Sequence, residues 1–289
     1  MYRKSKNTTA VLFALLLMFI LFAGCEEPEI GVEWVNDYTS VGKSNLSYMD
    51  DCAQGLYNVI TSHPDWVGEF NVGNSNAWEK HFKSSSLGGL DDTWVDAVDL
   101  AMFAGHGSAK TGTGRGSAFT FGQNANDDWY LASIPSNREP KWGDDDLEWI
   151  VFNSCSILCL QGDISAHPDE EPVLYNICER WANSDVMHGL HYIFGFRTTT
   201  WDYTSQDRGE IFAEYLLGLR GDGTKRTIRC AWIMATRETD MDANNLGAYL
   251  RAFSSGANTL NDHIWECGSV SDDPDPSTQS YAYCSWPCL

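Results

Sequence analysis

The sequence predicts an α/β protein built on a mainly parallel, doubly wound sheet. Two unbroken apolar runs, 100–104 and 149–152, lack the alternation of a half-exposed strand, and they suit strands that are covered on both faces. Strand-like and helix-like segments also alternate along the chain. This alternation favours parallel strands joined by crossover helices.

The elements are expected in a regular order. An opening strand is predicted near 31–35, and apolar residues at helical spacing predict a helix over 51–61 that begins at the capping residue Asp51. A weaker helix is expected at 76–82, followed by a strand at 97–104. The later elements are a hairpin through 119–121 and 129–131 in the glycine-rich segment 108–146, a strand at 149–152, a helix over 173–181, a strand at 190–196, and a helix that starts with the capping box of Asp207 and Glu210 and ends at Gly221.

The first 24 residues have the layout of an export signal. Three basic residues precede an apolar stretch that is short for a membrane span, and the stretch closes in Leu-Phe-Ala-Gly before Cys25. This ending resembles a bacterial lipobox, although Phe22 replaces the usual leucine. We therefore expect a lipoprotein-type signal peptide at 1–24 and acylation of Cys25, which would anchor the protein to a membrane at the cell surface or in the periplasm. The alternatives are an ordinary signal peptide or an uncleaved N-terminal anchor.

Composition limits the partners and the number of domains. The chain has 289 residues and a formal net charge of −21, and the signal peptide carries three of its 19 basic residues and none of its 40 acidic ones. This acidity repels phosphate backbones, so nucleic acid is not expected as a partner. We expect one α/β domain over 25–265, followed by an acidic, cysteine-containing tail over 266–289.

Eight cysteines follow Cys25. Such a number is far below the density of a disulfide scaffold. Cys267, Cys284 and Cys288 gather in the tail, where a disulfide would replace missing core, but the sequence does not fix any pairing.

A histidine and a cysteine stand just beyond the two apolar strands. His106 follows the first strand and Cys155 follows the second. In an open α/β sheet, ligands bind in the crevice outside the carboxyl ends of the strands, so both side chains are expected to face one site. A thiol beside an imidazole is the minimum equipment of a cysteine nucleophile.

These two motifs resemble those of the caspase, gingipain, legumain and clostripain group of cysteine peptidases, clan CD. In each case one apolar strand ends in His-Gly and a second ends in a small residue and Cys, here Ser154 and Cys155, and the spacing of 49 residues from His106 is close to that known for caspases. Stretches such as 32–38 and 128–132 are similar to an uncharacterised family of prokaryotic exported proteins with the same pattern.

The resemblance implies a caspase-like fold over 25–265 and peptide-bond hydrolysis by a His106/Cys155 dyad. It also implies an oxyanion hole formed by the backbone N–H groups of Gly107 and Cys155. A pseudo-site, or a disulfide at Cys155, is the alternative.

The segment after the strand at 190–196 would border the same crevice. Within it, Arg197, Trp201 and Asp202 are the candidate substrate-binding residues: Arg197 for an acidic side chain, and Asp202 or Asp207 for a basic one. Arg197 paired with a neighbouring carboxylate is the competing interpretation.

No cofactor and no metal ligand set is predicted. Asp144, Asp145 and Asp146 could attract calcium, which some clan relatives bind, but a solvated loop is the simpler interpretation.

Two functions remain open from the sequence. The first is an exported, lipid-anchored cysteine endopeptidase, a hydrolase acting on a peptide or protein. The second is a non-catalytic surface binding lipoprotein on a caspase-like scaffold, with some of its 12 tryptophans as contact platforms.

Overall fold

A computed structural model describes residues 27–108, 118–121, 129–163 and 173–289. The predicted signal peptide at 1–24 and the predicted acylation site Cys25 lie outside the described residues. None of the helices within the described ranges is both long and apolar enough to cross a bilayer.

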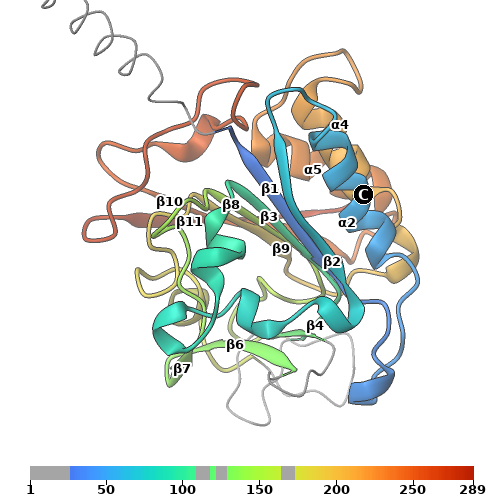
Figure 1. The fold of residues 1–289 in the computed structure, drawn as a ribbon, viewed down its shortest axis with the longest axis vertical. Coiled ribbons are helices and arrows are strands. Elements are labelled where there is room, and N and C mark those ends of the chain that lie inside the picture. The colour runs from blue at the N-terminus through green and yellow to red at the C-terminus, as the bar shows by residue number, and fades with distance from the viewer. Residues whose placement is uncertain (1–26, 109–117, 122–128, 164–172) are drawn as a thin grey trace, which may run out of the picture.

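A seven-stranded mixed sheet forms the centre of the molecule (Figure 1), which confirms an α/β fold. Its strand order is β11-β10-β9-β8-β3-β1-β2, with parallel pairing from β2 to β9 and antiparallel pairing of β9 with β10 and of β10 with β11. The strands are β1 (Glu29–Trp34), β2 (Val67–Gly73), β3 (Leu100–Ala104), β8 (Trp149–Asn153), β9 (Tyr192–Phe196), β10 (Leu246–Phe253) and β11 (Ser280–Pro287).

The two predicted apolar strands lie side by side in the middle of this sheet. β3 and β8 are buried at every position, and Leu100 pairs with Trp149 in a parallel register that continues to Ala104 and Asn153. Their side chains alternate between two apolar clusters, one on each face of the sheet. The unbroken apolar runs are explained by this double burial, and the parallel register brings the two strand ends to the same edge.

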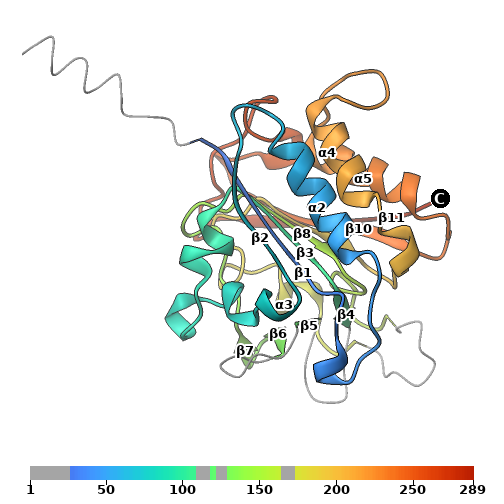
Figure 2. The ribbon, with the colours of Figure 1, turned by 45° about the vertical axis from the view of Figure 1, so that its right-hand side comes forward.

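Three helices cover one face of the sheet (Figures 1 and 2): α2 (Met49–Ile60), α4 (Arg208–Leu217) and α5 (Ile228–Thr239). α2 and α4 approach closely because Gly209 has no side chain, and a Cβ built there would lie 1.9 Å from the Cys52 carbonyl oxygen. The predicted caps are wrong in detail. Asp51 lies inside the first turn of α2, Asp207 takes the N-cap position of α4 but its side chain makes no cap bond, and α4 ends at Leu217 with Gly218, not Gly221, as its C-cap.

The opposite face is covered differently from a standard doubly wound fold. Short 3₁₀ turns, the four-residue helix α3 (Ile177–Arg180) and a small antiparallel sheet pack there, so the helices predicted over 76–82 and 173–181 are wrong in type or length. The predicted hairpin is confirmed by the pairing of β5 with β6. The small sheet comprises β4 (His106–Ser108), β5 (Ala118–Thr120), β6 (Tyr130–Ile134) and β7 (Asn137–Arg138). Across the described residues, the 3₁₀ turns are Thr39–Val41, Asn74–Asn76, Glu79–His81, Ser85–Leu87, Asp91–Thr93, Val95–Ala97, Asp202–Thr204 and Thr259–Asn261, and the last of these contacts β10 and α5 instead of this face.

The C-terminal segment belongs to the same domain. β11 pairs with β10 along its whole length, from Ser280 to Pro287, so the predicted boundary between 265 and 266 is corrected. Cys267 and Cys288 are buried in the core, and all eight cysteines of the described residues are free thiols. Packing and strand pairing therefore hold this segment in place, where the sequence suggested a disulfide.

Candidate active site

A cleft of about 490 Å³ opens at the carboxyl ends of β3 and β8. Both His106 and Cys155 line it, together with their neighbours Gly107 and Ser156. His106 and Cys155 therefore lie at one cleft beyond the carboxyl ends of β3 and β8, as the sequence predicts. Gly105, Ser108 and Asn153 also line the cleft, and the rest of the wall comes from 42–49 and from 199–205, two segments that are far apart in the chain.

His106 is held by backbone and side-chain contacts on two sides. Its backbone N–H donates to the Tyr38 hydroxyl over 2.7 Å, and the two rings lie 4.5 Å apart between centroids. The Nε2 atom lies 2.8 Å from the carbonyl oxygen of Ser44. A carbonyl oxygen only accepts hydrogen bonds, so Nε2 carries the hydrogen, and in the neutral ring Nδ1 is the atom that can accept a proton. The Ser44 carbonyl is therefore the group that orients the imidazole.

The environment keeps His106 neutral. Burial lowers the pKa of its ring below the ordinary value, and the Lys43 charge acts in the same direction. The hydrogen bond to Ser44 and the negative charge of Asp202 oppose this change without reversing it. A neutral imidazole is the form that can act as a general base.

Cys155 lies in a tight turn that begins where β8 ends. The next residue, Ser156, has a φ of 56°, a left-handed conformation that non-glycine residues adopt rarely and that is frequent at functional sites. The Cys155 sulfur donates to the Thr200 carbonyl oxygen over 3.3 Å and accepts from the Thr200 N–H over 3.4 Å. These two contacts fix the thiol against the 199–205 segment.

The Cys155 thiol is not preformed as a thiolate. Burial raises its pKa above the ordinary value, and the Asp240 charge adds to this, although the Thr200 hydrogen bond and Arg208 oppose them. Within the described residues, no hydrogen bond joins Cys155 to His106. The free protein therefore presents a neutral thiol and a neutral imidazole in one cleft, and proton transfer between them has to accompany attack on a carbonyl group.

Gly107 brings its backbone against that of Cys155. A Cβ built on Gly107 would lie 2.2 Å from the Cys155 carbonyl oxygen and 2.9 Å from the Cys155 nitrogen, so a side chain fits only if one of the two segments moves. The two backbone N–H groups predicted to form an oxyanion hole thus come from adjoining backbone segments at the cleft wall.

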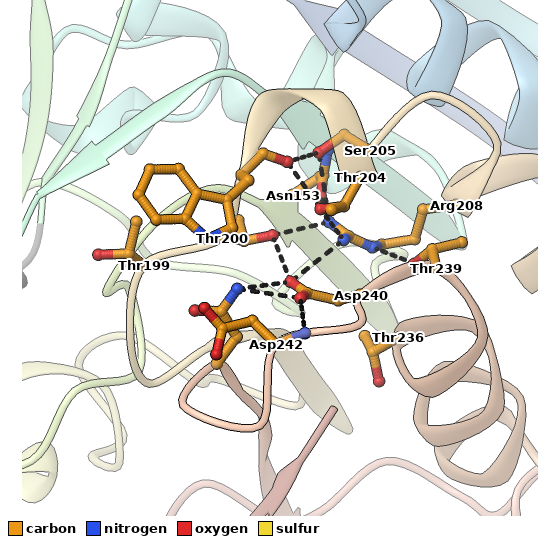
Figure 3. A network of polar contacts seen from close by, with 12 residues as sticks. Asn153, Thr199, Thr200, Thr204, Ser205, Arg208, Thr236, Thr239, Asp240 and Asp242 are labelled. Atoms are coloured by element: carbon orange, nitrogen blue, oxygen red, sulfur yellow. Dashed lines mark hydrogen bonds and ion pairs between the residues drawn. The ribbon is translucent and has the colours of Figure 1, made fainter. Parts of the chain in front are cut away.

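Below the cleft lies a buried arginine that the sequence did not reveal (Figure 3). Arg208 is fully buried and donates to Asn153 Oδ1 over 2.5 Å and to Thr200 Oγ1 over 3.1 Å, and its Nη2 lies 3.7 Å from Asp240 Oδ2. Three further hydrogen bonds reach the hydroxyl groups of Thr204, Ser205 and Thr239. Arg208 therefore links the end of β8 to the segment that holds the Cys155 sulfur.

Of the three candidate substrate-binding residues, Trp201 and Asp202 line the cleft and Arg197 does not. Arg197 does not line the cleft, and its guanidinium makes two hydrogen bonds of 2.8 and 2.9 Å to Asp163. Asp202 lines the cleft, but its carboxylate accepts the N–H groups of Ser47 and Tyr48. Asp202 thus anchors the loop that carries Ser44, and Arg197 is paired elsewhere.

Trp201 is the candidate whose side chain is exposed at the cleft. It lines the cleft with 43% of its surface exposed, and its ring stacks at 6.4 Å with that of Tyr203, which is 69% exposed. The wall of the cleft therefore carries one exposed aromatic ring, that of Trp201, together with the charged residues Lys43 and Asp202, and Tyr203 lies just outside the lining.

Across the described residues, one group of three potential metal ligands is found, and it lies away from the cleft. It consists of Asp99, Asp146 and Glu148 at the amino ends of β3 and β8.

One family model, described as a domain of unknown function (DUF6345), matches residues 32–287. The match includes both strand-end motifs and the C-terminal strand β11. No curated protein matches the chain.

Proposed function

The chain belongs to the DUF6345 family, and we propose that it is an exported, lipid-anchored cysteine endopeptidase of the caspase and gingipain type. One observation carries the proposal: His106 and Cys155 line one cleft at the carboxyl ends of adjacent parallel strands. The Ser44 carbonyl supports it, because it leaves Nδ1 of His106 as the proton acceptor.

The proposed reaction follows from these positions. Nδ1 of His106 takes the thiol proton while the Cys155 sulfur attacks the carbonyl carbon of a peptide bond. The N–H groups of Gly107 and Cys155 stabilise the oxyanion. As the carbon–nitrogen bond breaks, the leaving amine takes the proton from His106 and a thioester remains on Cys155. Water, deprotonated by His106, then hydrolyses the thioester, and the proton returns to the thiol.

The substrate is proposed to be a peptide or protein. The chain would meet it outside the cytoplasm, held to a membrane through a lipid on Cys25, with no role for nucleic acid or for a cofactor in the reaction. The exposed ring of Trp201 in the cleft wall offers a contact surface for an apolar or aromatic substrate side chain.

Peptide mapping after chemical labelling tests the dyad. We expect a peptidyl chloromethyl ketone to label Cys155 at pH 7 in the wild type and far more slowly in His106→Ala. Small iodoacetamide has no carbonyl placed in the cleft, so its reaction with Cys155 should follow the thiolate fraction and rise only at alkaline pH, because burial raises the pKa of Cys155.

The exposed thiol of Cys178 serves as the internal control in the same digest. Equal ketone labelling of Cys155 with and without His106, or labelling no faster than that of Cys178, would mean that the cleft binds ligands without catalysis.

Alanine at Gly107 is expected to lower peptidase activity by roughly 100-fold or more, the typical effect of losing an oxyanion donor. The added methyl group has to displace the Cys155 backbone. Gly256→Ala is a matched control, because a Cβ at that glycine meets nothing within 4 Å. Initial rates and melting temperatures of the two variants give the comparison, and similar rates for both would remove Gly107 from the site.

A further inference from the structure

A second cluster of reactive side chains lies at the opposite end of the two central strands. Asp99 directly precedes β3, Glu148 directly precedes β8, and Asp146 lies two residues before Glu148. One carboxylate oxygen from each of the three lies within 4.8 Å of the others. The parallel pairing of Leu100 with Trp149 holds the first two acids side by side.

Glu148 is the acid whose burial needs an explanation. The residue is 8% exposed, and its Oε2 atom is buried and accepts no hydrogen bond from the described residues. Buried carboxylate oxygens in folded proteins are almost always paired, because leaving one unpaired costs free energy. An additional partner at this position would satisfy that oxygen.

The neighbours of Glu148 make its position more costly. Burial raises the pKa of Glu148 to about 10, and the charges of Asp99, Asp146 and Asp273 act in the same direction. Burial likewise raises the pKa of Asp99 to about 7, against a hydrogen bond from the Glu29 N–H. A bound cation would offset the repulsion among these closely spaced carboxylates.

We propose that Asp99, Asp146 and Glu148 bind a calcium ion at the amino ends of β3 and β8. All three ligands are carboxylates, the hard oxygen donors that suit Ca²⁺ and Mg²⁺ and not softer metals. Oxygens bound to one Ca²⁺ at 2.3–2.6 Å lie at most about 5 Å apart, which agrees with the spacing here. Ca²⁺ is favoured over Mg²⁺ because it accepts an irregular ligand set with some water, whereas Mg²⁺ demands near-ideal octahedral geometry.

The half-buried position of Asp146 leaves one side of the cluster open to solvent for ion entry and for water ligands. The other two acids of the run do not join the cluster: Asp144 pairs with Lys141, and Asp145 is exposed. The sequence thus indicated only the aspartate-rich run 144–146. In the structure, Asp146 of this run lies together with Asp99 and Glu148, which the sequence did not group with it.

The ion would act on stability and not on catalysis. Asp99 accepts the Glu29 N–H over 2.6 Å, so the site touches the first residue of β1 as well as the starts of β3 and β8. Three neighbouring strands of the sheet would be tied together at the end that lies opposite the cleft.

Thermal unfolding of the full chain, freed of metal with EDTA and then titrated with Ca²⁺, tests the site. We expect the melting temperature of the wild type to rise by several degrees at saturating Ca²⁺. A ligand whose free concentration is 100 times its Kd stabilises the folded state by about 2.7 kcal/mol. Mg²⁺ at the same concentration should give a much smaller rise. Calorimetric titration should show one Ca²⁺ bound per chain.

Glu148→Gln should fold, melt in EDTA no lower than the wild type, and lose the calcium response. Asp146→Asn should weaken calcium binding at least tenfold, and it serves as the second variant because its side chain is half-buried. Asp145→Asn is the matched control, with the same loss of charge one residue away and an unchanged response expected. An absent calcium shift, an equal response to Mg²⁺, or a response that survives in Glu148→Gln would overturn the assignment. The melting and calorimetric measurements do not depend on peptidase activity, so this proposal and the proposed peptidase function can fail independently.

Discussion

Replacement of Cys155 by alanine is expected to abolish peptide cleavage, with a loss on the order of 1,000-fold or more, because removing the nucleophile of a covalent mechanism leaves only substrate binding and the oxyanion donors. The thiol donates to the Thr200 carbonyl and accepts from the Thr200 N–H at the edge of an existing cleft, so the alanine variant should keep its fold. The measurement is the initial rate of cleavage of a mixed peptide library, followed by mass spectrometry.

Two companion variants separate the chemistry from its surroundings. His106→Ala should lose activity to a similar extent, because a base and a nucleophile that act as one unit give non-additive losses. Cys178→Ala removes an exposed thiol and should leave the rate unchanged. Undiminished cleavage by Cys155→Ala would show that the dyad is not the catalyst, and absence of cleavage in the wild type as well would favour the binding function.

Arg208→Met should lower the free energy of unfolding by about 3–5 kcal/mol, the usual cost of removing one partner of a buried ion pair. Methionine retains much of the side-chain volume but leaves the buried Asp240 carboxylate without its ionic partner and Asn153 and Thr200 without a donor. Chemical denaturation monitored by tryptophan fluorescence gives the free energy.

The loss should shrink when Asp240→Asn is added, because the double variant buries no unpaired charge. Arg220→Met is the surface control: Arg220 pairs with Glu214 and Glu238 while partly exposed, and its replacement should cost about 1 kcal/mol or less. A cost for Arg208→Met as small as that of Arg220→Met would show that the buried network contributes little.

The central strands and the positions of His106 and Cys155 were predictable from the sequence. β3 and β8 are covered on both faces, so burial leaves an unbroken apolar run that a single sequence displays. The reactive residues follow these runs directly, and the topology of parallel strands brings them to one edge.

The outer strands and the base of the cleft were not predictable. β2 is half-exposed and has glycines at its second and last positions, and β11 directly follows a segment rich in serine, aspartate and proline, so turn-forming residues in or beside each strand obscure its pattern. Arg208 stands in the first turn of α4, where an arginine is ordinarily solvated, and it is buried by contacts with three other segments: the end of β8, the 199–205 segment and residues 239–240. The Ser44 carbonyl is backbone, which has no residue signature.

The order of strands in the main sheet has a consequence for how the chain assembles. After β1 and β2 have paired, β3 joins the free edge of β1, and each later strand of this sheet (β8, β9, β10 and finally β11) then pairs with the strand of the sheet that precedes it in the chain. No strand has to insert between two that are already paired. The sheet can therefore grow at one edge in the order in which the chain emerges during synthesis, and each strand is exposed as that edge only until the next one pairs with it.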